Sequence, residues 1–114
     1  GFTLMHIDEG IDTGEIIHQK RPRINVYDNS HHVGCKIIQE MTNDYIRLIS
    51  EYDKVVEKVQ PSFSNSKICY RKDSTTTSIE KMYANIKSGM FHRYLKNKKG
   101  RDGMYPIIQQ EFLI

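Results

Sequence analysis

The chain has 114 residues, of which 38% are hydrophobic and 27% are charged, and its formal net charge is +3. A chain of this length can form one modest domain with a small core, and its charge is too low to indicate nucleic-acid binding by itself. There is no apolar run long enough to cross a bilayer and no signal-peptide pattern, and two cysteines are too few for a disulfide framework, so we expect a cytoplasmic protein.

The segment GFTLMHIDEGIDTGEII at the start of the chain places an acidic loop between two apolar runs. Residues 2–7 mix aromatic, β-branched and apolar side chains over the length of a strand, and residues 15–19 do the same. Gly10 and Gly14 permit positive backbone dihedral angles, and the loop aspartates can bond to nearby amides. These features predict two short strands joined by a tight loop, and composition alone favours an ordinary hairpin turn over a functional loop.

The order of residues in this segment resembles the signature of the folate-dependent formyltransferases, which include methionyl-tRNA formyltransferase, glycinamide ribonucleotide formyltransferase and the sugar N-formyltransferases. The positions that fit the pattern are Gly1, Thr3, Asp8, Gly10, Asp12, Thr13, Gly14 and Ile16. The resemblance continues more loosely to about residue 51 and then fades. It implies an α/β fold that is the C-terminal part of a formyltransferase-type fold, with short strands around an acidic loop packed by a long helix.

The resemblance also implies roles for the loop residues. In the family the second aspartate of the loop is catalytic, and that residue corresponds to Asp12. The loop backbone embraces the pteridine of 10-formyltetrahydrofolate, the formyl donor, which implies contacts from Asp8, Glu9, Gly10, Ile11 and Thr13. A carboxylate held near the reacting nitrogen can relay the proton that an amine must lose after it attacks the formyl carbon.

The family pattern requires an Asn, and a His two positions later, upstream of the loop, whereas this chain begins inside the signature. We therefore expect a fragment that is inactive alone and completed by a missing N-terminal catalytic half. Residues 1–60 would be the C-terminal part of the catalytic domain, and residues 61–114 a small C-terminal extension. Asn29 and His31 have the right spacing but follow Asp12, so we interpret them as a coincidence. A non-catalytic remnant that acts as an interaction module is the alternative.

The acceptor amine is the least constrained part of this interpretation. Methionyl-tRNA formyltransferases carry a separate C-terminal barrel that helps to grip tRNA, and the segment after residue 60 looks too short and too helical for one. Residues 68–95 look similar to the extension of sugar N-formyltransferases, so we expect a nucleotide-linked amino sugar, with a methionyl-tRNA formyltransferase fragment as the alternative. The basic residues of segment 93–101 would meet the acceptor phosphates, or would simply be solvated.

The middle of the chain predicts a connection followed by one long helix. Pro22 opposes helix in residues 20–27, where Ile24 and Val26 alternate as in a strand. A helix is expected from residue 31 to about residue 59, either continuous or with a break, and Pro61 with the SFSNS stretch would end it. Apolar residues recur there at intervals of three and four and should bury one face against a sheet: Val33, Ile37, Ile38, Met41, Tyr45, Leu48, Ile49 and Tyr52.

After residue 61 the pattern is weaker. Residues 68–70 have the composition of a short strand, and Thr77 with Glu80 resembles a capping box that opens a helix closed by Gly89. Met82, Tyr83, Ile86 and Met90 would form the apolar side of that helix.

The histidines give two further expectations. His31, His32 and Cys35 lack a convincing fourth ligand, so we expect no metal site. His6 precedes the loop and would line the folate cleft, unless it is only a satisfied strand histidine.

Overall fold

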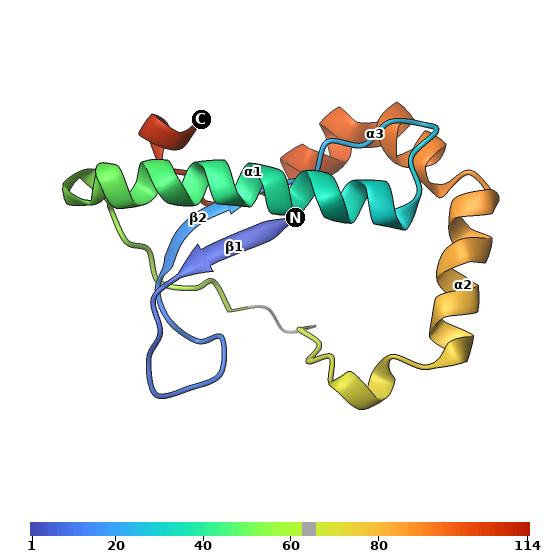
Figure 1. Ribbon diagram of the computed structural model, residues 1–114, viewed down its shortest axis with the longest axis horizontal. Coiled ribbons are helices and arrows are strands. Elements are labelled where there is room, and N and C mark those ends of the chain that lie inside the picture. Colours follow the sequence, from blue (N-terminus) through green and yellow to red (C-terminus); the bar gives the residue numbers. More distant parts are fainter. Residues whose placement is uncertain (63–65) are drawn as a thin grey trace.

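The computed structural model describes residues 1–62 and 66–114 (Figure 1). The described chain is a small mixed α/β fold with a two-stranded antiparallel sheet and three α-helices. The strands are β1 (Phe2–Met5) and β2 (Ile16–Lys20), and the helices are α1 (Ser30–Ser50), α2 (Thr76–Lys87) and α3 (Met90–Met104). Short strands around an acidic loop, packed by a long helix, are therefore confirmed. Part of the SFSNS stretch lies outside the described residues.

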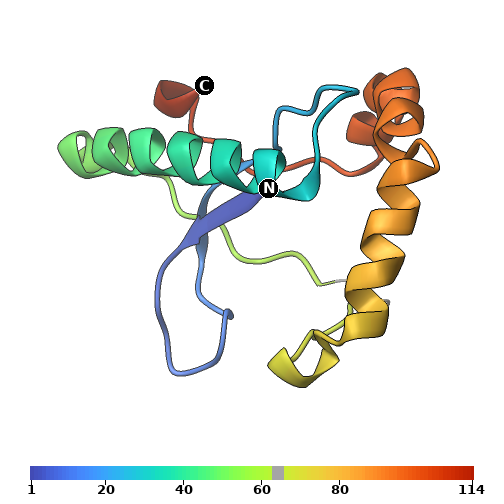
Figure 2. The ribbon, with the colours of Figure 1, turned by 45° about the vertical axis from the view of Figure 1, so that its right-hand side comes forward.

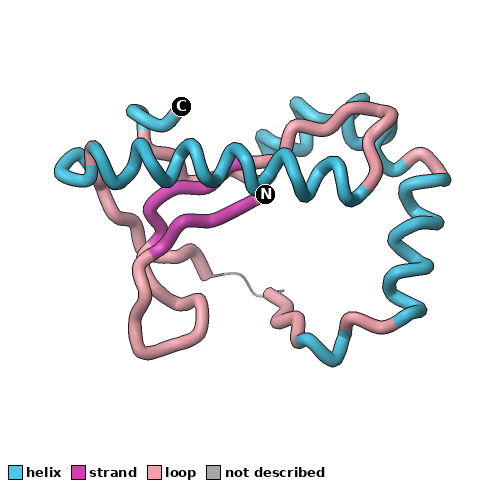
Figure 3. Tube along the Cα trace, viewed as in Figure 1, coloured by secondary structure: helices cyan, strands magenta, loops and turns pink. Residues whose placement is uncertain are grey.

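The β1–β2 hairpin depends on other segments, because an isolated pair of strands is at best marginally stable in water. Leu4 pairs with His18, and the register shifts between Leu4 and Met5. Lys58 joins β2 through two backbone hydrogen bonds with Ile16, of 2.7 and 3.0 Å. The N–H of Gln19 donates to the carbonyl oxygen of Ile108 at 2.7 Å. Distant parts of the chain thus complete the small sheet, whose strands are drawn in magenta in Figure 3.

Helix α1 begins where the sequence predicts and ends earlier. The Asn29 side chain caps its start by accepting from the N–H of His32 at 2.8 Å. The helix stops at Ser50, so the expected end near residue 59 is wrong. A 3-10 turn at Tyr52–Lys54 follows, and the chain then turns back so that Lys58 can pair with β2. Tertiary pairing, together with β-branched valines that favour extended backbone, overrides the helical periodicity here.

The face of α1 that packs on the hairpin is narrower than predicted. Asp44 and Leu48 are buried, and Val33, Ile37 and Met41 are half-buried on the same side. Three other members of the expected stripe remain largely exposed: Ile38 at 62%, Tyr45 at 52% and Ile49 at 59%. At 100° per residue these three lie beside the packed face and form one row, here called the outer α1 stripe. The prediction that the whole set is buried is therefore wrong.

The end of the chain completes the core of its beginning. Leu113 is 1% exposed and clusters with the buried Ile17 and Leu48, with Leu4 and Val55 packed around them. Leu113 belongs to a 3-10 turn at Glu111–Leu113 that lies against α1 (Figure 1). The proposed division at residues 60 and 61 stays a prediction.

Helices α2 and α3 form an arm beside this core. Figure 2 shows α2 standing apart from the hairpin, and no residue of α2 is buried. The cap of α2 is Thr75, which accepts from the N–H of Ser78 at 3.2 Å, so the expected box at Thr77 is wrong by two residues. Gly89 ends α2 as predicted, because its φ of +90° is a left-handed conformation that suits glycine.

Two elements after residue 61 differ from expectation. Residues 68–70 form no strand, and Ile68 is 71% exposed, since no described segment lies alongside to pair with it. Helix α3 was not predicted and contains the whole basic segment 93–101. Phe91 is its buried residue, and the ion pair between Arg21 and Asp102, of 3.2 Å, links the helix to the connection after β2.

Candidate functional site

The acidic loop between β1 and β2 is organised by the side chain of Asp8. One carboxylate oxygen accepts from the N–H of Gly10 at 2.9 Å and from the hydroxyl of Thr13 at 2.6 Å. The bond from Thr13, and to a smaller extent the bond from Gly10, holds the pKa of Asp8 below its ordinary value. A Cβ at Gly10 would overlap the Thr13 side chain, so glycine is required for this close approach. Asp8, Gly10 and Thr13 are thus brought together as one interlocked turn.

Asp12 stands on the far side of this turn in an unusual conformation. Its φ is +55°, the only positive value for a non-glycine residue in the described chain. Such a conformation costs about 1 kcal/mol and persists where the surroundings enforce it. The residue is exposed, and its carboxylate makes no hydrogen bond or ion pair with any residue of 1–62 or 66–114. The loop therefore presents an unengaged carboxylate on a constrained backbone.

Gln60 supplies the constraint from outside the loop. Its side-chain nitrogen donates one hydrogen to the carbonyl oxygen of Asp12 and the other to that of Gly14, both at 2.7 Å. A Cβ on Gly14 would overlap the backbone oxygen of His6, so the loop also closes tightly at its base. Sequence reasoning missed Gln60, because a contact between a side chain and a distant backbone leaves no periodic pattern.

Replacing Gln60 with Met keeps the length of the side chain and removes both donors. Two neutral hydrogen bonds of this kind contribute about 1 kcal/mol each, so the hydrogen-bonded amides of the loop and its base, those of Gly10 and His6, should exchange roughly ten-fold or more faster. Hydrogen exchange followed by mass spectrometry measures this change. Gln109→Met, at an exposed position, is the matched control and should leave the loop unchanged. Equal exchange in both variants would show that Gln60 does not hold the loop.

A second group of titratable side chains lies at the base of the loop. His6 Nε2 is 2.7 Å from a carboxylate oxygen of Glu57 and 3.3 Å from the hydroxyl of Tyr52. The carboxyl of Glu15 shares a hydrogen bond with Glu57, and that bond and the like charge raise the pKa of Glu15. His6 therefore has protein partners at the loop base, as a satisfied strand histidine would, and the segment carrying Glu57 was not foreseen as part of the site.

The remaining two predicted loop residues face solvent. Glu9 and Ile11 are exposed, Ile11 by 92%. Ile7, at the start of the loop, is 98% exposed. The backbone N–H groups of Glu9 and Ile11 donate to no other described residue. The loop thus offers free amide donors beside apolar side chains, a combination that suits one face and one edge of a flat heterocycle.

Comparison with known protein families, curated proteins and solved structures finds no match.

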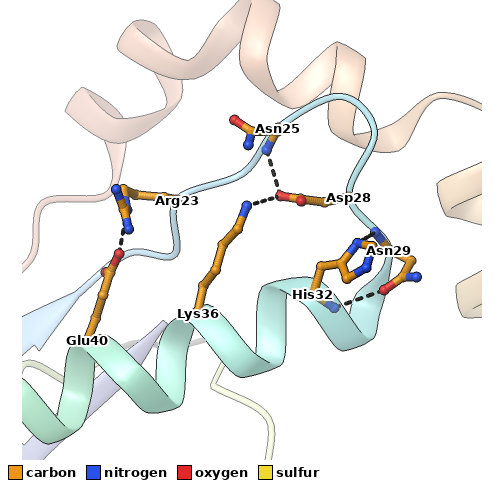
Figure 4. Close-up of polar contacts among 7 residues, drawn as sticks. All are labelled: Arg23, Asn25, Asp28, Asn29, His32, Lys36 and Glu40. Carbon is orange, nitrogen blue, oxygen red and sulfur yellow. Dashed lines mark hydrogen bonds and ion pairs between the residues drawn. The ribbon is translucent and has the colours of Figure 1, made fainter.

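The Asn29 and His31 pair has a structural explanation. Asn29 forms a reciprocal cap with His32, and the connection before α1 is fixed by Lys36, which pairs with Asp28 at 2.7 Å (Figure 4). This bond to Lys36 lowers the pKa of Asp28. His31 is exposed, with its ring 3.6 Å from the sulfur of Cys35. Nowhere in residues 1–62 or 66–114 do three His, Cys, Asp or Glu side chains gather to hold a metal ion.

A buried polar cluster joins the hairpin to α1. His18 is fully buried, and its Nδ1 accepts from the N–H of Gln110 at 3.1 Å. Its Nε2 lies 3.6 Å from Asp44, whose carboxylate pairs with Lys20 at 2.6 Å. Burial lowers the pKa of His18, although the Asp44 charge opposes the effect. The histidine is therefore neutral in the folded chain and serves as an acceptor in the core.

This burial makes stability depend on pH. The unfolded chain binds a proton at His18 near pH 6.5, whereas the folded chain does so only at lower pH. The burial of neutral His18 therefore does not lower the free energy of unfolding above about pH 7.5. Below that, the free energy of unfolding falls as the pH drops through 6.5. His18→Asn keeps an acceptor and removes the titration, so its unfolding free energy should decrease less between pH 7.5 and pH 5.5 than that of the natural chain.

Urea unfolding followed by circular dichroism at the two pH values tests this expectation. His92→Asn, at an exposed position on α3, should show the same decrease as the natural chain. An identical decrease in all three proteins would remove His18 as the cause.

No helix in the described part of the chain is long and apolar enough to span a membrane.

Proposed function

We propose that this chain is part of a folate-dependent formyltransferase and carries the active-site aspartate of the complete enzyme. The reaction transfers a formyl group from 10-formyltetrahydrofolate to an amine. The observation that carries the proposal is the state of Asp12, which combines an unengaged carboxylate with a backbone fixed by Gln60. A proton relay needs both properties, because the carboxylate must be free to accept and must stay where the proton is released.

The proposed role of Asp12 follows from the charges that change during formyl transfer. An amine that attacks the formyl carbon forms a new C–N bond and gains positive charge on its nitrogen. That nitrogen must lose a proton before the bond from the formyl carbon to the folate nitrogen breaks. Asp12 takes the proton, directly or through one water, and a proton must finally reach the departing folate nitrogen. The upstream Asn and His of the family pattern would stabilise the oxyanion.

The donor would lie along the same loop. The turn made by Asp8, Gly10 and Thr13 keeps the backbone exposed, and Glu9 and Ile11 contribute free N–H groups. Hydrogen bonds from these amides to the edge of the pteridine, with the apolar side chains against its face, would bind the donor without changing its reactivity. This arrangement supports the assignment of residues 8–13 to donor binding.

A missing N-terminal half is proposed to complete the fold. The outer α1 stripe of Ile38, Tyr45 and Ile49 is exposed, and no described strand pairs with the edge of β1 that faces away from β2. An exposed apolar helical row and an open strand edge are each typical of a surface that another part of a protein covers. We assign this surface to the upstream half, which would also bring the oxyanion donors to Asp12.

Reconstitution tests the proposal. The chain, joined to or coexpressed with an upstream half that contains the Asn and His, should release tetrahydrofolate in the presence of an acceptor amine, and the chain alone should not. Ile38→Asp with Ile49→Asp should abolish assembly, measured by copurification, because two charges would be buried in an apolar contact. Gln39→Asp with Asn43→Asp, on the solvent side of α1, is the control that should assemble normally. An assembled but inactive complex would contradict the proposed reaction.

The proposed acceptor is a nucleotide-linked amino sugar. Described residues after position 66 fold mainly as the helices α2 and α3, which supports a small extension in place of the C-terminal barrel of methionyl-tRNA formyltransferases. The basic segment 93–101 lies beyond the other end of β2, whose five residues alone span about 16 Å. We therefore place the acceptor amine at the loop and give this segment no role in formyl transfer. Turnover with methionyl-tRNA and with no amino sugar would overturn the choice of acceptor.

We also propose that the protein is located in the cytoplasm, which is a reducing compartment. Cys35 and Cys69 are both free and exposed, and such thiols persist where disulfide formation is suppressed.

A further inference from the structure

A hollow of about 700 Å³ lies between α3, the connection after β2 and the segment that follows α3. Its volume is in the range of sites that hold small molecules. Arg21 and Ile24 line it from the connection, and Tyr105 and Ile107 line it from the chain after α3. The hollow begins where β2 ends, whereas the acidic loop precedes β2, so the two are at opposite ends of the hairpin (Figure 1).

One side of the hollow is a polar row on α3. Arg93, Asn97 and Arg101 follow one another at intervals of four residues, so they share a face of the helix. With a rise of 1.5 Å per residue, the two arginines stand about 12 Å apart along the helix axis. Such spacing places one guanidinium toward each end of a ligand of nucleotide size.

The charges around the hollow are not balanced. Arg21 is 3.2 Å from the carboxylate of Asp102 and is therefore neutralised. Arg93 donates to the backbone oxygen of Ser88 at 2.6 Å, and neither Arg93 nor Arg101 pairs with a carboxylate in residues 1–62 or 66–114. Three arginines against one aspartate leave the lining with an excess of two positive charges. An anion would supply the missing partners.

Apolar and aromatic side chains also line the hollow. Phe91, which is buried, Tyr94 and Tyr105 line it together with Ile24. The guanidinium of Arg101 lies 5.6 Å from the centre of the Tyr105 ring, which holds a planar cation against an aromatic face. A free phosphate would leave these surfaces unused, and an apolar molecule would leave the arginines unpaired.

We propose that this hollow binds a nucleoside diphosphate, with the diphosphate at Arg93 and the base stacked at the other end, against Arg101 and Tyr105. Guanidinium groups match phosphate oxygens in bidentate geometry, and nucleobases stack on tyrosine rings and arginine planes. The volume of about 700 Å³ suits one nucleotide better than an extended strand of nucleic acid. This site is separate from the acidic loop and does not rest on formyl transfer.

Titration calorimetry of the whole chain with ADP and UDP tests the site, with adenosine and inorganic pyrophosphate as component probes. At least one diphosphate should bind saturably at micromolar to low millimolar concentration, roughly ten-fold or more tightly than either component. No saturable binding, or equal binding of pyrophosphate alone, would overturn the proposal. Tighter binding of a short single-stranded RNA than of any nucleoside diphosphate would assign the surface to nucleic acid instead.

Paired variants separate a built site from general attraction. Arg93→Gln with Arg101→Gln and Lys96→Gln with Lys99→Gln each remove two positive charges from α3, but neither lysine lines the hollow. The arginine pair should weaken binding roughly ten-fold or more, and the lysine pair less than about two-fold. Equal weakening in the two variants would contradict the site.

Nuclear magnetic resonance of the natural chain provides an independent measurement should the arginine variant fail to fold. Shifts on adding the nucleotide should concentrate in residues 21–24, α3 and residues 105–107. Shifts centred on residues 8–14 would place the nucleotide at the acidic loop and overturn the assignment.

Discussion

Replacing Asp12 with Asn is expected to slow turnover of the reconstituted enzyme by roughly 100-fold or more, with little change in donor binding. The substitution removes the group that accepts a proton and keeps the size of the side chain, and Asn tolerates the positive φ of +55° as well as Asp does. Loss of general acid or base catalysis has an effect of this size, about 2.7 kcal/mol in the barrier. Initial rates of tetrahydrofolate release at saturating donor measure it.

Glu9→Gln is the matched control for Asp12→Asn. It makes the same chemical change in the same exposed loop, at a residue whose carboxylate has no proposed part in proton transfer. Turnover close to that of the natural enzyme is expected for Glu9→Gln. Near-normal turnover of Asp12→Asn would remove Asp12 from the mechanism, while a similar loss in both variants would indicate a general effect of charge in the loop.

Replacing Leu113 with Ala is expected to lower the unfolding free energy of the chain by about 3 kcal/mol. Leu113 is 1% exposed and contacts the core of Ile17 and Leu48, so the substitution leaves a cavity that a small core cannot close. A loss of this size is a large fraction of the stability of a small domain. Urea unfolding followed by circular dichroism measures the change.

Ile114→Ala provides the comparison for Leu113, because Ile114 is the next residue and is 78% exposed. Its unfolding midpoint should stay within the error of the natural chain. If Leu113→Ala also changed stability by less than about 0.5 kcal/mol, the packing of the chain end against α1 would not contribute to the core.

Local chemistry in the sequence was sufficient to predict the elements whose determining residues are neighbours in the chain. The hairpin runs and the Asn29 cap predicted β1, β2 and the start of α1, because the determining residues are neighbours in the chain. The end of α1 was wrong because Lys58 pairs with Ile16, a distant residue. Helix α3 was missed because Gly100 and Gly103 weaken its pattern, and because its ion pair with Arg21 comes from a distant segment.

The candidate site likewise contains local contacts that the sequence predicts and distant contacts that it does not. The turn of Asp8, Gly10 and Thr13 follows from residue types that bond within a few positions, so the sequence pointed to it. Gln60 reaches the loop across 48 residues, and Glu57 meets His6 from the same returning segment. Both contacts arise from how the chain folds back after α1, and no local pattern indicates that path.

The outer α1 stripe has a practical consequence for the isolated chain. The exposed row of Ile38, Tyr45 and Ile49 is an apolar surface through which two copies can dimerise, or through which many copies can aggregate non-specifically. Concentrating the chain is therefore expected to favour self-association over a monomer.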